Sequence, residues 1–458
     1  MSWSTVDEVP VDASRTRVYA EGWQSWSPAT WHTGDTASPI LPNEPWEHLM
    51  RFRPGAELAR DAVQAEGLLV VDPGDGGPAR WYGAPDPRVE VPSIRVEVEG
   101  GTAIVRSDGH VVTGATDAGG ETALITYGDR IAALVDAPPR PAPTVWCTWY
   151  QYFENVTAAD VLENVEGIAL HDLAVDVIQI DDGWSTGLGE DLVPRAGFAD
   201  LDEVVDGIRG AGRAVGIWLA PFIVGRDTQL ARRHPDWLVG DAGRNWGQDL
   251  AGLDLTHPGV RDLLAAHLAG LRDRGVTYLK LDFLYGGALP GDRHDGSSAI
   301  QAYRSGLELI RSVMGPRAYL TGCGAPIGPS LGLVDAMRVS PDTFHEGGED
   351  GSRGLRGAMA LTARAWQQGR YWTNDPDCLV ARPSYRLREE WHDVVDRFGG
   401  LRSVSDRVAD LDDWGLDVTR SLLSRGSRHL PFEDSVVAEG AGFAAAARHP
   451  PQGPAVLG

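Results

Sequence analysis

Hydrophobic and polar positions follow two different patterns along this chain, and the change falls near residue 140. Over residues 1–135, apolar and polar residues alternate in short runs between glycine-rich turns, as at 93–99, 102–105 and 109–113. A period of two is typical of strands with one buried face. We therefore predict that residues 1–135 form an antiparallel, β-sandwich-like domain.

A proline-rich linker is expected next, at residues 136–143, because its prolines can join neither a helix nor an interior strand. After it, short apolar segments alternate with amphipathic helices, which is typical of a parallel α/β fold. Eight strands are expected, at residues 145–153, 175–181, 214–222, 277–283, 317–323, 336–340, 371–375 and 401–404.

Alternating strands and helices over residues 144–428 predict a (β/α)8 TIM barrel, a fold of typically ~250 residues. A doubly wound sheet is disfavoured, because no Gly-x-Gly-x-x-Gly turn follows the first strand. Helices are expected at 157–170 and 258–274, the second of them opened by Thr256 and closed by Gly275. Residues 429–458, rich in Ala, Gly and Pro, are expected to be a short irregular C-terminal tail or remnant.

The composition of the chain limits the kinds of partner that this protein is expected to bind. The 458 residues carry a net charge of −24, which repels a nucleic acid backbone and an anionic membrane face and favours a neutral partner. The amino terminus has neither a basic start nor an apolar run, and three cysteines with no Cys-x-x-Cys spacing indicate a reducing compartment. A cytoplasmic protein is expected. The twelve histidines form no His-x-His or His-Glu-x-x-His motif, so neither a metal nor another cofactor is expected.

Two aspartates, Asp282 and Asp342, end strands from different parts of the predicted barrel. The carboxyl ends of barrel strands meet on one face, where two carboxylates can face each other across a substrate. Lys280 shares a side of its strand with Asp282, so we expect its ammonium to hold that aspartate ionised, as a nucleophile requires. Asp342, four residues after Arg338, is then the candidate proton donor. A structural Lys–Asp pair at the barrel floor is the alternative.

Further acids and aromatic residues lie at neighbouring strand ends. Asp181 and Asp182 end the second strand, Trp218 lies on the third and Trp149 on the first, in a chain with sixteen tryptophans. Carboxylates accept hydrogen bonds from sugar hydroxyls, and an indole stacks on the apolar face of a pyranose, so these residues favour a carbohydrate cleft. An Asp-Asp-Gly turn and aromatic core residues are the structural alternatives.

Other polar residues near strand ends are better explained structurally. Cys323 has no neighbouring histidine in the sequence, and a small buried residue is the favoured role. Asp254 precedes a helix and is expected to organise that loop. The Asp-x-Asp pair at Asp375 and Asp377 could bind a metal ion, but it is equally consistent with a turn.

Seven motifs follow one another along residues 144–380. They are Trp-Cys-Thr-Trp-Tyr at 146–150, Ile-Asp-Asp-Gly-Trp at 180–184, Gly-Ile-Trp-Leu-Ala-Pro-Phe at 216–222, Lys-Leu-Asp-Phe-Leu-Tyr at 280–285, Gly-Cys-Gly-Ala-Pro at 322–326, Met-Arg-Val-Ser-Pro-Asp at 337–342 and Trp-Thr-Asn-Asp-Pro-Asp-Cys at 372–378. In content and order they resemble the motifs of glycoside hydrolase family 36, the α-galactosidases or melibiases. Residues 22–28 also resemble the aromatic segment that the family's amino-terminal β domain extends toward the barrel mouth.

The resemblance implies cleavage of terminal α-linked galactose from oligosaccharides or other galactosides, with retention of the anomeric configuration. By motif position, Asp282 matches the nucleophile and Asp342 the acid/base, whose carboxyl groups lie about 5–5.5 Å apart in a retaining enzyme. Asp181 and Asp182 match the acids that hold the galactose 4- and 6-hydroxyls. The other candidate substrate-binding residues are Lys280, Arg338, Trp218, Trp149, Cys323 and either Trp26 or Trp23.

The chain departs from the family pattern in three ways. Its amino-terminal domain is short, the usual carboxyl-terminal β domain is reduced, and Ser340 stands where relatives commonly have glycine. These departures leave homo-oligomer formation and substrate preference open. The same residues also fit an α-N-acetylgalactosaminidase or other α-pyranosidase, a galactosyltransferase like raffinose synthase, or a sugar-binding barrel without catalysis. The presence of both candidate carboxylates argues against the last.

Overall fold

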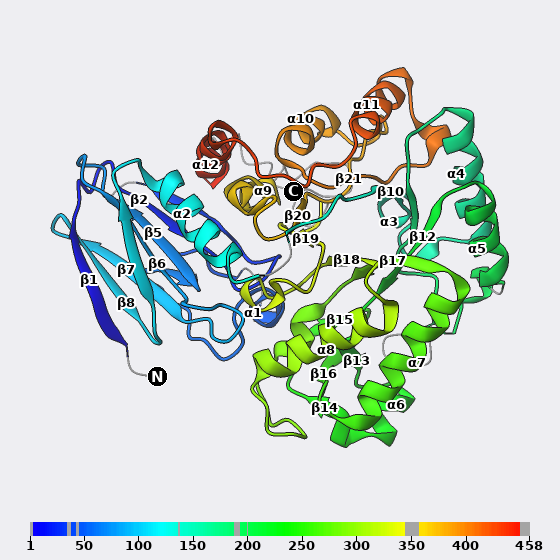
Figure 1. The fold of residues 1–458 in the computed structure, drawn as a ribbon, viewed down its shortest axis with the longest axis horizontal. Coiled ribbons are helices and arrows are strands. Elements are labelled where there is room, and N and C mark those ends of the chain that lie inside the picture. The colour runs from blue at the N-terminus through cyan, green and yellow to red at the C-terminus, as the bar shows by residue number, and fades with distance from the viewer. Residues whose placement is uncertain are drawn as a thin grey trace, which may run out of the picture.

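The amino-terminal part of the protein is built from two antiparallel β-sheets that pack face to face (Figure 1). The computed structural model describes residues 3–33, 38–42, 45–135, 138–186, 193–198, 200–343 and 357–448. Within these residues, one sheet has the order β1 (Ser4–Pro10), β8 (Thr102–Ser107), β7 (Ser93–Glu99), β4 (Val63–Glu66). The other has the order β3 (Thr30–Thr33), β2 (Arg17–Ala20), β5 (Leu68–Asp72), β6 (Ala79–Gly83), β9 (Val112–Thr116).

Alternation along the strands of the second sheet places apolar side chains on both of its faces. Leu69 and Val71 on β5 pack in the core between the two sheets, whereas Leu68 and Val70 join the larger core that continues toward the barrel. Helix α2 (Gly120–Ala132), which the strand pattern did not predict, buries Leu124 in that larger core. The sheet is therefore fixed to the rest of the molecule by its own side chains.

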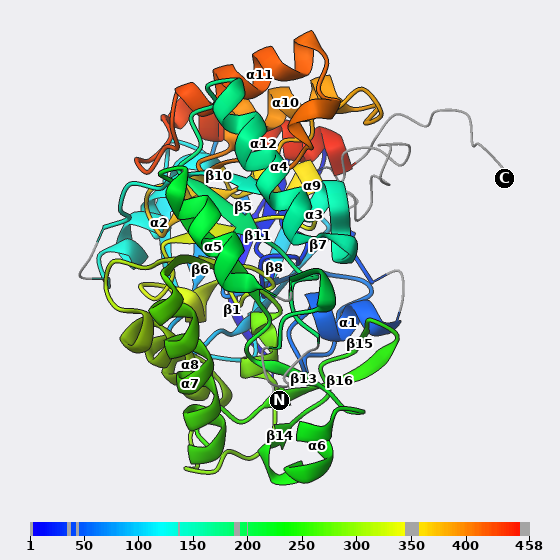
Figure 2. The same cartoon turned by 90° about the vertical axis from the view of Figure 1, so that its right-hand side faces the viewer.

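Residues 144–404 contain eight parallel strands among those described, and the prediction of a TIM barrel is confirmed. The order is β20 (Thr373–Asp375), β19 (Ala336–Arg338), β18 (Tyr319–Gly322), β17 (Val276–Leu281), β12 (Ala214–Leu219), β11 (Val177–Ile180), β10 (Thr144–Cys147), β21 (Arg402–Val404). The ring closes where Leu401 N donates to Asn374 O (2.9 Å) and Leu379 pairs with Val404. Helices cover the outside of the strands, among them α4 (Ala158–Leu170), α5 (Leu201–Gly210), α7 (Pro258–Arg274) and α8 (Ala299–Met314) (Figure 2).

Two local predictions are corrected. The first strand ends at Cys147, and a single helical turn, α3 (Trp149–Tyr152), carries the following aromatic residues out of the sheet. Helix α7 is capped by His257, whose Nδ1 accepts from Gly259 N at 3.1 Å. The hydroxyl of Thr256 cannot cap this helix because it donates to Asp254 Oδ1 (2.7 Å), an aspartate that organises the loop as expected.

The expectation of an irregular segment after residue 428 is wrong for helix α12 (Asp434–Arg448). This helix packs against α9 (Gly357–Ala363), β3 and α2, and so joins the barrel to the amino-terminal sheets. A Cβ atom at Gly440 would lie 2.6 Å from Thr362 O, so a glycine is needed for this close approach. Alanine and glycine reduce sequence complexity, but alanine is also the strongest helix former. Residues 449–458 of the expected tail lie outside the described residues.

An antiparallel insertion follows strand β12 and was not predicted. It comprises β13 (Ile223–Gly225), α6 (Gln229–Arg233), β14 (Leu238–Val239), β15 (Arg244–Asn245) and β16 (Gln248–Leu253). Residues 138–143 of the expected linker carry neither helix nor strand, and residues 136–137 lie outside the described ranges. Within those ranges, no helix is long and apolar enough to cross a membrane.

A buried arginine connects the amino-terminal segment to the barrel. Arg364 and Glu21 are both almost fully buried, and Arg364 Nε donates to Glu21 Oε1 at 2.8 Å. The same guanidinium donates to the carbonyl oxygens of Ser25 (2.8 Å) and Val339 (2.9 Å). Loop 21–28 and the end of strand β19 are therefore held by one side chain.

Replacing Arg364 with methionine is expected to lower the free energy of unfolding by about 3 to 5 kcal/mol, because it leaves the Glu21 carboxylate buried without its cation. Denaturation with urea measures the change. Arg420→Met is the matched control: its ion pair with Asp417 is exposed, so a loss below about 1 kcal/mol is expected. Equal losses in the two variants would contradict this account.

Candidate active site

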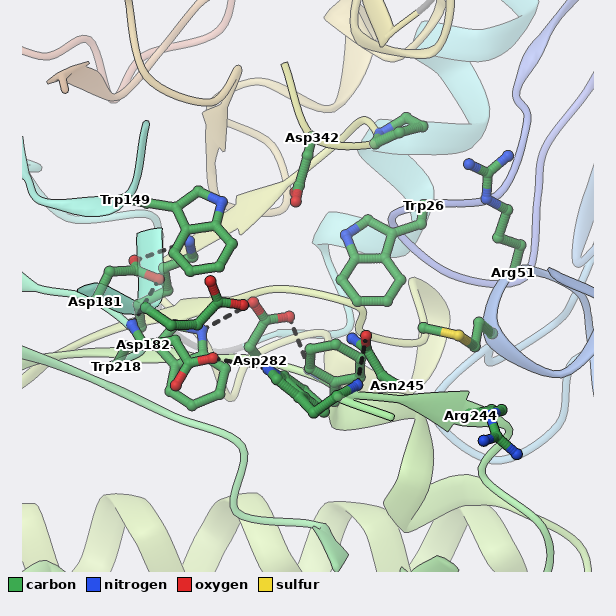
Figure 3. A pocket seen from close by; sticks show the side chains of 16 residues that line it. Trp26, Arg51, Trp149, Asp181, Asp182, Trp218, Arg244, Asn245, Asp282 and Asp342 are labelled. Carbon is green, nitrogen blue, oxygen red and sulfur yellow. Dashed lines mark hydrogen bonds and ion pairs between the residues drawn. The ribbon is translucent and has the colours of Figure 1, made fainter. Parts of the chain in front are cut away.

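A cavity of about 320 Å³ lies at the carboxyl ends of the barrel strands (Figure 3). This volume is within the usual range of ligand-binding pockets, roughly 300–1,000 Å³. The lining residues are Trp26, Met50, Arg51, Trp149, Glu154, Asp181, Asp182, Trp218, Arg244, Asn245, Trp246, Lys280, Asp282, Phe283, Pro341 and Asp342. The structure thus brings together both candidate catalytic aspartates and most of the candidate sugar-binding residues.

Asp282 follows strand β17, and two donors orient its carboxylate. Trp218 Nε1 donates to Oδ2 (3.0 Å), and Phe283 N donates to Oδ1 (2.7 Å). The second bond depends on a sharp turn in which Phe283 has a φ of 51°. Burial raises the pKa of Asp282, and the nearby charge of Lys280 opposes that rise. The carboxylate is fixed and poorly hydrated, as suits an attacking group.

Lys280 does not pair with Asp282 as expected. Its Nζ instead lies 3.0 Å from Asp181 Oδ2, which also accepts from Gln179 Nε2 at 2.5 Å. Burial lowers the pKa of Lys280, but the charge of Asp181 and other neighbouring groups raise it well above its usual value. The ammonium therefore stays charged at the cavity wall, with its main contact on Asp181.

Asp182 is bound by the unpredicted insertion. Trp246 Nε1 donates to its Oδ2 (2.9 Å), and Gly183 N donates to its Oδ1 (2.7 Å). Burial, together with the adjacent charge of Asp181, raises the pKa of Asp182 to about 6. A carboxylate held by an indole on one oxygen keeps lone pairs for further donors such as hydroxyl groups.

Asp342 lines the cavity on the side opposite Asp282 (Figure 3). Its side chain is 39% exposed, and its Oδ1 accepts from Arg338 Nη2 at 3.0 Å. Arg338 itself is buried behind the cavity wall, where it also pairs with Asp377 at 3.1 Å. Asp342 is thus the accessible member of the group, and Arg338 supports it from behind.

Cys323 and Trp23 also lie outside the cavity. Cys323 is fully buried beside Asp282 and Arg338, and burial raises the pKa of its thiol well above the usual value, so the thiol is protonated. Trp23 packs in the hydrophobic core. Trp26 forms the cavity wall instead, with its ring edge against Phe283 at a centroid distance of 5.0 Å.

Several lining residues were missed because they come from segments far from the barrel strands in sequence. Met50 and Arg51 belong to helix α1 (Pro45–Arg51), while Arg244, Asn245 and Trp246 belong to the insertion. A tryptophan between two glycine-containing turns was the available signal in the insertion. Among the described residues, no cluster of three His, Cys, Asp or Glu side chains could hold a metal ion.

Comparison with known proteins agrees with this geometry. Residues 140–297 match the sequence profile of the Melibiase family. The structure of the α-galactosidase TtGalA from Thermus thermophilus, in complex with p-nitrophenyl α-D-galactopyranoside, superposes with a TM-score of 0.75 and 28% identity, over 92% of this chain and 89% of that one. AgaA, a family 36 α-galactosidase from Geobacillus stearothermophilus, has a similar fold at 15% identity, with a TM-score of 0.61 over 91% of this chain and 61% of that one.

Among curated sequences, the myogenesis-regulating glycosidase of Mus musculus is 29% identical over 147 residues, which are 30% of this chain and 20% of that protein. The alignable region is thus about a fifth of that relative's length. Glycoside hydrolases are thus the class of protein to which this fold and this cavity are similar. Within that class, the chain is similar to the family 36 α-galactosidases, or melibiases.

Replacing Asp182 with asparagine is expected to stabilise the ligand-free protein at pH 7. The carboxyl group binds its proton more tightly in the folded state, so its contribution to stability falls as pH rises from about 4 to 6. At about 1.36 kcal/mol per pKa unit, less the cost of altered hydrogen bonds, the gain is about 1 to 3 kcal/mol.

Thermal unfolding at pH 7 and pH 4 measures this effect. The gain should fall to about 0.5 kcal/mol or less at pH 4, where the folded carboxyl is protonated and the unfolded one, with an ordinary pKa of 3.8, is about half ionised. Asp273→Asn, which changes a 68% exposed aspartate on α7, is the control and should have little effect at either pH. A gain for Asp182→Asn that is independent of pH would contradict the burial argument.

Proposed function

We propose that this protein is a retaining glycoside hydrolase that removes terminal α-linked galactose from α-galactosides. The observation that carries the proposal is the pair of carboxylates, Asp282 and Asp342, on opposite sides of one cavity. Similarity to an α-galactosidase studied with p-nitrophenyl α-D-galactopyranoside and with stachyose supports galactosides as the substrate class. We also propose a division into an amino-terminal β domain at residues 1–135, a linker at 136–143, a catalytic barrel at 144–428 and a short carboxyl-terminal tail or remnant at 429–458.

In the first step, an Asp282 oxygen attacks the anomeric carbon from the β face while the bond from that carbon to the leaving oxygen breaks. Asp342 donates its proton to the leaving oxygen, and a covalent glycosyl–Asp282 ester results. The fixed orientation of Asp282 supports this role, because Trp218 and Phe283 hold its carboxylate in place before substrate enters.

In the second step, Asp342 accepts a proton from a water molecule whose oxygen bonds to the anomeric carbon. The ester bond to Asp282 breaks, its electron pair returns to the carboxylate, and Asp342 regains its proton. Two inversions at the same carbon release galactose in the α configuration. The accessible position of Asp342 at the cavity surface supports a role that requires contact with both leaving group and water.

We assign recognition of the sugar to the cavity wall opposite Asp342. Asp181 and Asp182 are proposed to accept hydrogen bonds from the 4- and 6-hydroxyls of galactose, with Lys280 as a further donor. Trp218, Trp149 and Trp26 supply apolar surface for the sugar ring. Because Trp26 comes from loop 21–28, the amino-terminal segment contributes to the proposed subsite.

The proposal predicts hydrolysis of 4-nitrophenyl α-D-galactopyranoside with α-galactose as the first product, as followed by NMR. Asp282→Asn is expected to lower kcat at least about a thousandfold with the fold intact, since it removes the nucleophile. Preference for the N-acetyl-α-galactosaminide would contradict galactosides as the substrate, and release of β-galactose would contradict a retaining mechanism. Binding of α-galactosides without turnover would support a non-catalytic sugar-binding barrel.

A second prediction concerns Asp342→Ala. Loss of the acid should slow hydrolysis of raffinose, whose leaving group needs a proton, far more than hydrolysis of a 2,4-dinitrophenyl α-galactoside, whose leaving group does not. We expect the ratio of the two kcat/KM values to change at least about a hundredfold. Stopped-flow and steady-state assays of both substrates measure it. Equal losses on the two would exclude Asp342 as the acid/base.

A further inference from the structure

Behind Asp342 lies a buried polar cluster, defined here as the Asp377 cluster: Tyr150, Arg338, Thr343 and Asp377. Its members come from α3, β19, the residue after Asp342, and the loop after β20. All are buried, and none lines the cavity. Substrate in the cavity therefore does not contact the Asp377 cluster directly, and the ion pair between Arg338 and Asp342 links the cluster to the cavity.

Asp377 is the centre of this cluster. Its Oδ2 accepts from Thr343 N (2.7 Å), Thr343 Oγ1 (2.9 Å) and the hydroxyl of Tyr150. Its Oδ1 accepts from Cys378 N (2.8 Å), and its own N donates to Asp375 Oδ1 (2.9 Å). A φ of 81° at this residue, unusual outside glycine, shows that the surrounding bonds determine its conformation. The peptide that follows Asp342 is thereby anchored to the loop after β20.

Arg338 divides its charge between two carboxylates. The same nitrogen, Nη2, lies 3.0 Å from Asp342 Oδ1 and 3.1 Å from Asp377 Oδ2. An arginine paired with Asp342 alone favours the ionised form, which cannot donate a proton. A second carboxylate on the same guanidinium reduces that bias. Asp377 therefore opposes the effect of Arg338 on Asp342.

Other ionisable groups around Asp342 also affect whether it is protonated. Asp282, from the opposite side of the cavity, disfavours a second negative charge, and its own pKa is raised chiefly by burial and further by Asp342. The buried Tyr150 hydroxyl and Cys323 thiol, whose pKa values are raised well above the usual, remain neutral. Lys280, Arg51 and Arg244 line the same cavity as Asp342, while Arg338 bonds to Asp342 at 3.0 Å and is shared with Asp377.

We propose that Asp377 is a positioning residue for the acid/base: it anchors the peptide after Asp342 and shares Arg338, so that Asp342 stays protonated at working pH. This inference rests on the proposed function, because it assigns Asp342 the role of proton donor. The seven-motif resemblance and the cavity lining both leave Asp377 without a role.

The test is the pH profile of kcat/KM for Asp377→Asn. Asparagine keeps the size of the side chain but removes its charge, so Arg338 acts undivided on Asp342 and favours its ionised form. The alkaline limb of the profile, where the acid loses its proton, is expected to move to lower pH by about 1 unit. At pH values above this limb, kcat/KM of the variant should be about tenfold lower than that of the wild-type enzyme. Raffinose should be affected more than 2,4-dinitrophenyl α-galactoside.

Tyr150→Phe gives the opposite expectation. It removes a donor that disperses the charge of Asp377, so Asp377 draws Arg338 away from Asp342 more strongly. The alkaline limb should then move to higher pH, by a few tenths of a unit. This variant keeps the inference testable if Asp377→Asn does not fold, because an unmoved or lowered limb in Tyr150→Phe would overturn it.

Asp335→Asn is the matched control. Asp335 precedes the same strand, β19, and pairs with Arg140 and Arg311, but it lies away from the cavity. This variant should lose stability without any movement of the alkaline limb. Equal movement in Asp335→Asn and Asp377→Asn, or an active Asp377→Asn enzyme with the wild-type profile, would overturn the inference alone. A wild-type protein without α-galactosidase activity would overturn the proposed function and this inference together.

Discussion

The ion pair between Arg364 and Glu21 connects the barrel to the amino-terminal segment at a buried position. One guanidinium contacts Glu21, three more carbonyl groups of loop 21–28 and the carbonyl of Val339, which leads to Asp342. Trp26, on that loop, and Asp342 are both lining residues of the cavity. The position of one wall of the site therefore depends on an interaction that no substrate touches.

A second constraint is electrostatic. Asp181, Asp182, Asp282 and Asp342 surround one small cavity, and burial raises the pKa of Asp182 and Asp282. Each of the four accepts from a fixed N–H group or cation: Lys280, Trp246, Trp218 or Arg338. Such fixed donors act strongly in a poorly hydrated site. The acids thus keep distinct environments, as the different roles proposed for them require.

The barrel could be predicted because its strands are short apolar runs that end on polar residues, a pattern visible at Asp181, Asp282 and Asp342. The partners of these acids could not. Lys280 shares a strand face with Asp282 but pairs with Asp181, from the neighbouring part of the ring. Trp246 lies in an insertion whose short strands give no clear period, and α12 was mistaken for a tail because its small residues resemble a low-complexity segment.

The amino-acid sequence alone determined the order of strands along the chain, the β part followed by the barrel, and the carboxylates at the carboxyl ends of the barrel strands. These features follow from the local period of apolar and polar residues and from residues adjacent in the chain. The tertiary structure decided which cation faces which carboxylate, which of Trp23 and Trp26 reaches the cavity, and how Asp377 comes to share Arg338. Those contacts join residues far apart in sequence, and local pattern carries no information on the distance between them.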